Sequence, residues 1–261
     1  MGASALLNLE IKGYGDKVFT DKIKKMSITL VSWLRAFQSG ILFFILPLAL
    51  SAAPDLDGTW MLASGSSSGF PLFGVAPEGQ GLLYTDEGQA RQQSYDFLVD
   101  DPSLLCVPAS LGRMWGNPGS PIEFRLYEDR VIIRYELFDL IRTIKLNQDG
   151  HPLDLAPSVV NVDGQRFETM GHSIGWYEEE MLLVETIGYA DSYLTTSVGI
   201  PQSQAMRTLE RFFRVGEQVA LEITFIDPII FQAPFTVSYR LNPSRFEVAE
   251  YGCTPENASY R

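Results

Sequence analysis

Three side chains of this chain could together perform proton-transfer chemistry: His172, Tyr135 and Arg142. An imidazole serves as acid or base near neutral pH, a tyrosine hydroxyl donates a proton, and a guanidinium steadies a developing anion. Such a set needs no cofactor, and it suits an isomerase, hydratase or cyclase that acts on an apolar substrate. We therefore name these three residues as catalytic candidates, on condition that the protein is an enzyme.

A structural alternative applies to the same region. Opposite charges on neighbouring strands form ion pairs that cross-link a sheet, with the polar face of each strand outward. The charged residues that this interpretation treats as structural pairs are Glu136, Asp139, Arg142, Glu185, Glu210 and Arg211.

Other catalytic classes find little support. The chain holds only two histidines, His151 and His172, and no HxH or HExxH spacing, so we predict no metal site. No GxSxG motif is present, which argues against a hydrolase triad. No cofactor is predicted.

Aromatic residues are spread through the predicted strands. If the sheet closes, some of them point inward and can line a cavity for an apolar small molecule, although such residues also serve as plain core. The ligand-binding candidates are Trp60, Trp176, Phe225 and Tyr239.

Alternating apolar and polar residues predict an all-β fold. Val131, Ile133 and Tyr135 fall on one face of a strand, while Ile132 and Arg134 fall on the other. An antiparallel sheet with one apolar face must curl into a barrel or stack as a sandwich. We expect a single antiparallel β-barrel, lipocalin-like or calycin-like, or a closely related sandwich. The predicted strands are residues 58–63, 122–127, 130–137, 141–146, 181–186, 208–215, 219–227, 235–241 and 246–251.

One short helix is predicted at residues 85–98, with Thr85 as its N-cap and acidic residues in its first turn. The stretches before and after it, residues 70–81 and 100–121, are rich in Pro and Gly or lack periodicity, and they are predicted to be irregular.

An apolar run at residues 40–50, followed by small residues, is typical of a secretory signal. We therefore expect residues 1–53 to be an upstream segment with a signal peptide, and residues 54–261 to form a single exported β domain in the periplasm or outside the cell. Met26 is an alternative start to Met1. An uncleaved anchor is the alternative to cleavage; after cleavage no membrane span is expected.

The predicted mature part carries 29 acidic residues against 14 basic ones, a net charge of −15. Such a surface repels phosphate backbones, so nucleic acid is not expected as a partner. Thirteen of the 14 basic residues are Arg, and many are expected to pair with carboxylates.

Two cysteines remain in that part, Cys106 and Cys253. An oxidising compartment would join them if their Cα atoms lie within about 7 Å, and two separate buried thiols are the alternative.

Two resemblances add expectations. The start of the first strand, Gly58-Thr59-Trp60, resembles the Gly-x-Trp of lipocalins, which implies that the indole closes the bottom of a barrel. The mature chain as a whole is similar to a family of exported bacterial proteins without an assigned activity. That resemblance implies export and an all-β fold but no mechanism. It rests on residues 83–91, 100–108, 135–144, 171–186, 210–212 and 227–228; at Tyr177-Glu178-Glu179-Glu180 this chain departs from the family's Trp-Glu-Gly-Asp.

The sequence thus favours an exported barrel of the cell envelope that binds a hydrophobic, lipid-like small molecule. The first alternative is a cofactor-independent enzyme of the same fold. The second is a structural envelope component that docks a protein partner.

Overall fold

The structure is a computed structural model that describes residues 53–63, 81–117 and 119–254. The predicted signal segment up to residue 52 lies outside this part. Among the described residues, no helix has both the length and the apolar character needed to cross a membrane.

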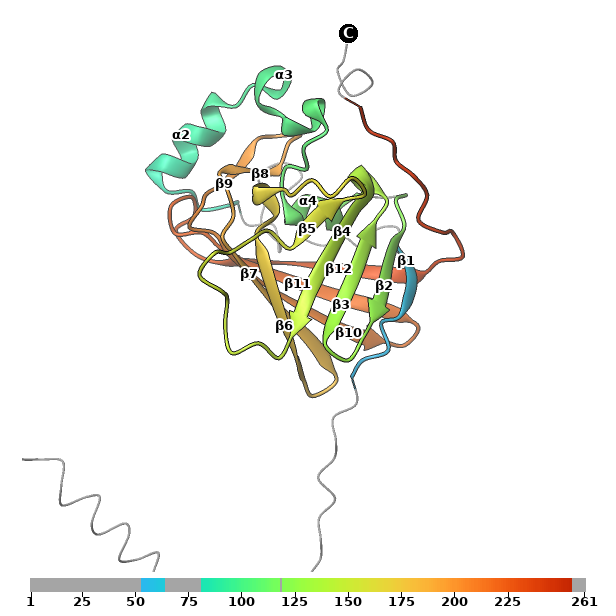
Figure 1. The fold of residues 1–261 in the computed structure, drawn as a ribbon. Coiled ribbons are helices and arrows are strands. Elements are labelled where there is room, and N and C mark those ends of the chain that lie inside the picture. The colour runs from blue at the N-terminus through green and yellow to red at the C-terminus, as the bar shows by residue number, and fades with distance from the viewer. Residues whose placement is uncertain (1–52, 64–80, 118, 255–261) are drawn as a thin grey trace, which may run out of the picture. The chain divides into compact units, whose positions relative to one another are not determined.

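Nine strands of the described chain close into a β-barrel (Figure 1), so the all-β barrel predicted from the alternation is confirmed. Their order is β3-β2-β1-β12-β11-β10-β7-β6-β4, and β4 pairs with β3 to complete the ring. Every pairing is antiparallel except the short parallel contact of β4 with β6. The strands are β1 (Gly58–Leu62), β2 (Ile122–Leu126), β3 (Arg130–Tyr135), β4 (Leu140–Leu146), β6 (His172–Glu178), β7 (Met181–Ile187), β10 (Arg207–Val215), β11 (Gln218–Ile226) and β12 (Phe235–Pro243).

Three shorter strands lie outside the ring. β5 (Val159–Asn161) pairs with β4, while β8 (Ser192–Thr195) and β9 (Ile200–Gln202) form a separate two-stranded sheet. None of these three strands was predicted from the sequence, nor was β6. The three are only three or four residues long, too short for an alternating pattern to stand out.

Strand alternation places the core inside the ring. On β3, Val131, Ile133 and Tyr135 are buried, while Ile132 and Arg134 are partly or fully exposed, as the period of two requires. The turn between β6 and β7 places Glu179 at a φ of 53°, and Gly216 between β10 and β11 has a φ of 60°. Both positions lie in the tight turns of antiparallel hairpins.

The predicted helix at residues 85–98 is present in part. α2 (Asp86–Ser94) begins at the predicted cap, where Thr85 Oγ1 accepts the Gly88 N–H at 3.0 Å. The chain then breaks because the Asp96 side chain caps a new helix, α3 (Phe97–Asp100). Gly88 packs so closely on Ile230 that a Cβ would lie 2.1 Å from the Ile230 carbonyl oxygen.

The stretch predicted to be irregular after residue 100 also contains helical turns. They are the 3-10 turn η2 (Pro102–Leu105), which Asp101 caps, and α4 (Leu111–Trp115), which Ser110 caps through the Arg113 N–H. Two further 3-10 turns are η3 (Leu137–Asp139) and η4 (Glu168–Met170). Five-residue elements carry too little periodicity to be seen in the sequence.

The predicted strand at residues 246–251 is wrong. This C-terminal stretch has no strand partner, and carboxylates satisfy its backbone instead: Glu136 accepts the Ala249 N–H, and Asp139 accepts the N–H groups of Tyr251 and Gly252. These bonds place the stretch beside η3. Glu136 and Asp139 therefore bind backbone rather than cationic side chains.

The predicted disulfide is confirmed: Cys106 is bonded to Cys253, with a Cα–Cα distance of 5.8 Å. It joins the segment before α4 to the C-terminal stretch, across 147 residues of chain. Closing so long a loop restricts the unfolded chain strongly.

We predict that replacing both cysteines, Cys106→Ser with Cys253→Ser, lowers the free energy of unfolding by about 2–5 kcal/mol. Urea denaturation of the full chain measures this. Reduced wild-type protein is the matched control and should behave like the variant. Equal stability of the oxidised and serine forms would contradict the prediction.

Candidate functional site

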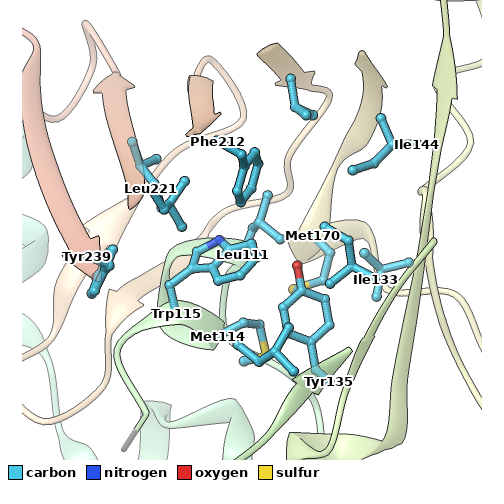
Figure 2. Packing of buried hydrophobic residues seen from close by; sticks show 14 of the residues in the cluster. Leu111, Met114, Trp115, Ile133, Tyr135, Ile144, Met170, Phe212, Leu221 and Tyr239 are labelled. Atoms are coloured by element: carbon cyan, nitrogen blue, oxygen red, sulfur yellow. The ribbon is translucent and has the colours of Figure 1, made fainter. Parts of the chain in front are cut away.

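Helix α4 fills the interior of the barrel. Its side chains Leu111, Met114 and Trp115 are each at most 2% exposed, and Figure 2 shows them among side chains of the surrounding strands. Gly112 allows this close fit, because a Cβ there would lie 2.9 Å from the Phe225 ring. A short helix, rather than strand residues alone, thus completes the core.

Trp115 occupies the space between opposite walls of the barrel (Figure 2). The centroid of its ring lies 6.2 Å from that of Phe124 on β2, 5.2 Å from that of Tyr135 on β3 and 5.4 Å from that of Phe212 on β10. Its Nε1–H donates to Glu210 Oε1 at 2.9 Å. In a nine-stranded ring of this order, β2 and β10 lie on opposite sides.

Glu210 forms a fully buried ion pair with Arg142. The Arg142 NH1 group donates to Glu210 Oε1 at 3.1 Å, its NH2 group donates to Oε2 at 2.5 Å, and both side chains are 0% exposed. The same guanidinium donates to Ser173 Oγ and to Thr186 Oγ1. Burial works against the charged guanidinium, but Glu210 together with Tyr135 and Tyr189 outweighs this effect, so the pKa of Arg142 lies above its usual value.

Two tyrosines border this pair. The Tyr189 hydroxyl is hydrogen-bonded to Thr208 Oγ1 at 2.7 Å. The Tyr135 hydroxyl is buried beside Arg142 without a well-formed hydrogen bond, and burial raises its pKa. The O–H group of Tyr135 is thus a hydrogen-bond donor in the core that a ligand could use.

His172 lies on the other side of the barrel wall. Ser173 points inward to Arg142, and because neighbouring residues of a strand face opposite ways, His172 points outward. There its Nδ1 lies 2.8 Å from Nδ1 of His151, which lies in the loop between β4 and β5. His151 Nε2 lies 3.5 Å from Glu185, which also pairs with Arg207.

Burial lowers the pKa of both imidazoles, and His151 lowers that of His172 further, so both are neutral at pH 7. Two Nδ1 atoms at hydrogen-bond distance need one donor and one acceptor. We assign the His151 proton to Nε2, which faces the Glu185 carboxylate, and therefore the Nδ1 proton to His172. The hydrogen bond between the two imidazoles thus connects the loop between β4 and β5 to the outer face of β6.

The structure thus brings Tyr135 and Arg142 together inside the barrel and separates His172 from them. The six charged residues offered as outward structural pairs also divide. Arg211 pairs with Glu222 and Glu185 with Arg207 on the outside, but Arg142 and Glu210 face inward. The expectation that every strand keeps its charges outward is wrong for that pair.

The four aromatic ligand candidates lie in different places. Phe225 and Tyr239 are buried next to α4, near Gly112 and Gly116 respectively. Trp60 is buried as well, with its Nε1–H bonded to the Leu56 carbonyl and the Arg214 guanidinium 4.8 Å from its ring centroid.

Trp176 shares the outward face of β6 with His172 and is partly exposed. It therefore lies outside the core.

Two central residues were not expected in the core: Trp115, which had no predicted role, and Glu210, which was predicted to be an outward structural charge. For Glu210 a signal existed: Thr208, Glu210 and Phe212 share one face of β10, and all three are buried. For Trp115 the Ser110 cap two residues after Pro108 was the available cue. Within the described ranges, no group of three or more His, Cys, Asp or Glu side chains converges as a metal site would require.

No protein-family model matches the chain, and no curated protein matches it significantly. Among solved structures, it is similar to a secretary abundant heat soluble (SAHS) protein from Ramazzottius varieornatus, at 8% identity and a TM-score of 0.32, covering 74% of this chain and 98% of that one. It is also similar to the fluorescent protein UnaG, at 10% identity and a TM-score of 0.32, covering 72% and 97%. Likenesses this remote say nothing of what this chain binds.

We predict that Glu210→Leu lowers the free energy of unfolding by about 3–5 kcal/mol, because it leaves the Arg142 guanidinium buried without its counter-charge. Adding Arg142→Met should recover much of that loss. Urea denaturation of the two single variants and the double variant gives the coupling.

The exposed pair of Arg211 with Glu222 is the matched control, and its loss should cost less than about 1 kcal/mol. Additive losses in the Arg142 and Glu210 variants would show that the two residues do not act as a pair.

We predict that stability falls as the pH drops below about 6.5, the ordinary pKa of histidine. The native pKa values of His151 and His172 are lowered, so in this range the unfolded chain binds more protons than the native one, and the loss is complete only below the native values. Two nearby charges also act on the pKa of His172: Asp154 raises it and Lys145 lowers it.

Melting temperatures between pH 8 and pH 5 measure this dependence. The variant His172→Gln should show a smaller decline, and His151→Gln is its matched partner. If the melting temperature of both variants declines as steeply as that of the wild type, the two histidines do not cause the pH dependence.

Proposed function

We propose that this chain is an exported barrel that binds an apolar small molecule in its core, in the place that α4 occupies. The observation that carries the proposal is that the interior is filled by a separate short helix rather than by strand residues alone. A barrel of about this size either fills itself or holds one ligand. Here the filling comes from α4 rather than from the strands that form the wall.

The attachment of α4 supports this proposal. At its start the Ser110 hydroxyl contacts the Leu194 carbonyl at 3.4 Å, and within it Trp115 bonds to Glu210. The anchors of the chain lie before the helix, at the Cys106 disulfide and at the Pro108 carbonyl, which accepts from Thr169. These two polar contacts, at Ser110 and Trp115, bind α4 itself, and the apolar packing of its side chains also holds it in place, so a ligand must replace that packing.

The energy of exchange is within reach of a ligand. A tryptophan side chain buries about 150–250 Å², which corresponds to about 4–6 kcal/mol. Leu111 and Met114 on the same helix are buried as well and add about 1.5–3 kcal/mol each. A ligand must bury as much apolar surface as these three side chains to offset the withdrawal of α4. A larger ligand gains a surplus that appears as binding affinity.

Export is the other part of the proposal. The disulfide of Cys106 with Cys253 is typical of an oxidising compartment, and the apolar run at residues 40–50 has the length of a signal. Together with the resemblance to exported bacterial proteins, these features favour the periplasm or the cell exterior.

The alternatives have weaker support. An enzyme of the proposed kind needs an acid–base residue in the core, and His172 faces outward while Arg142 is held by Glu210. A structural role needs a partner surface, and nothing in the described chain indicates which partner would cover one.

We predict that the full chain, purified from an envelope fraction and examined by native mass spectrometry, carries a stoichiometric small-molecule adduct. Denaturation then releases the molecule for identification. Trp115→Ala removes the competing side chain and should retain at least as much adduct, at a cost of about 3–5 kcal/mol in stability. A clean apo mass for both proteins would contradict the proposal.

A further inference from the structure

We infer that the molecule bound in this core is a planar aromatic heterocycle with an N–H donor, which takes the place of the Trp115 indole. This inference rests on the proposed function and names the class of ligand. Its basis is that the contacts of Trp115 define what the vacated site requires.

The shape of the site follows from the rings around Trp115. Phe124 is stacked on the indole with an offset, at an interplanar angle of 29°, while Tyr135 meets it edge-on at 70° and Phe212 lies tilted at 60°. Stacked and edge-on contacts favour a flat aromatic partner beyond the area that it buries. A flexible alkyl chain would fill the volume without these contacts.

The polar requirement comes from Glu210. Its Oε1 accepts from the Trp115 indole as well as from Arg142, and it is fully buried. When Trp115 withdraws, a buried carboxylate oxygen loses a donor, which is costly unless the ligand supplies another. A ligand carbonyl or ether at this point would instead set lone pairs against the carboxylate.

A second polar point lies next to it. The Tyr135 hydroxyl is buried in the same space, its ring is 5.2 Å from that of Trp115, and it makes no well-formed hydrogen bond. A ligand with an acceptor beside its N–H would use this donor. The indole of Trp115 has no such acceptor, so a ligand can make one hydrogen bond more than the side chain that it replaces.

The charge of the core excludes another class. Arg142 is already neutralised by Glu210 and also donates to Ser173 and Thr186. A carboxylate ligand would therefore meet a neutral pair rather than a free cation, and its own charge would be buried at a large cost. This disfavours fatty acids and other organic anions in this site.

The test uses pairs of ligands that differ only in the donor. Carbazole and fluorene have nearly the same shape, but carbazole has an N–H where fluorene has a CH2 group; indole and indene form the smaller pair. Wild-type full chain is titrated with the larger pair, and Trp115→Ala with the smaller pair, by calorimetry and by the shift in melting temperature.

We expect the N–H member of each pair to bind at least about tenfold more tightly, the effect of one hydrogen bond to a charged acceptor. Met114→Ala is the matched control, because it opens space in the same core while Trp115 still satisfies Glu210. In that variant indole and indene should bind alike.

The outcomes separate the inference from the proposed function. If the wild type binds carbazole and fluorene equally well, the ligand class is wrong while the binding barrel stands. If indole binds only to Trp115→Ala and the wild type binds neither tricyclic ligand, Trp115 is not displaced by a ligand of this class and the inference falls; the adduct found by native mass spectrometry decides the proposed function separately. If Trp115→Ala does not fold, the wild-type pair alone decides.

Discussion

The buried ion pair of Arg142 with Glu210 fixes the register of one side of the barrel. Arg142 on β4 reaches Ser173 on β6, Thr186 on β7 and Glu210 on β10, and these four strands are neighbours in the ring. Because a slip of one residue turns every side chain of a strand to the other face, it would leave one of these charges buried without its partner. The parallel contact of β4 with β6 spans only two residue pairs, so this polar group also helps to hold the ring closed.

The same pair determines what fills the rest of the core. An apolar interior with a buried carboxylate needs a further donor that brings little polar surface with it, and an indole meets that need: one N–H on a large apolar ring. Trp115 supplies this donor from α4, a helix of five residues. Ser110 caps the helix, and the Cys106 disulfide anchors the chain just before it. The identity of the filling residue thus follows from the electrostatics of the wall.

The sequence predicted those features that depend on local pattern. The alternation on β3, the Thr85 cap of α2 and the pairing of Cys106 with Cys253 are all confirmed, because a period of two, a capping side chain and two lone cysteines leave few alternatives. The core was harder to predict. A charge in a strand is normally outward, and only tertiary contacts show that Arg142 and Glu210 neutralise each other inside. Local pattern also does not show that His172 faces outward while Arg142 faces inward, so that the two side chains are not in contact.

A filled core does not exclude a binding site, since a tethered side chain acts as an internal competitor. Trp115 is attached to the barrel and so competes at a high effective concentration, which lowers the apparent affinity of any ligand by the small fraction of open molecules. Weak or poorly matched molecules therefore cannot displace it. A molecule that displaces Trp115 must replace its hydrogen bond to Glu210. It gains over Trp115 if it buries more ring surface and also accepts a hydrogen bond from Tyr135. In this arrangement α4 packs the core when no ligand is bound, and its contacts set the binding energy that a ligand must exceed. Stability and selectivity therefore arise from the same contacts.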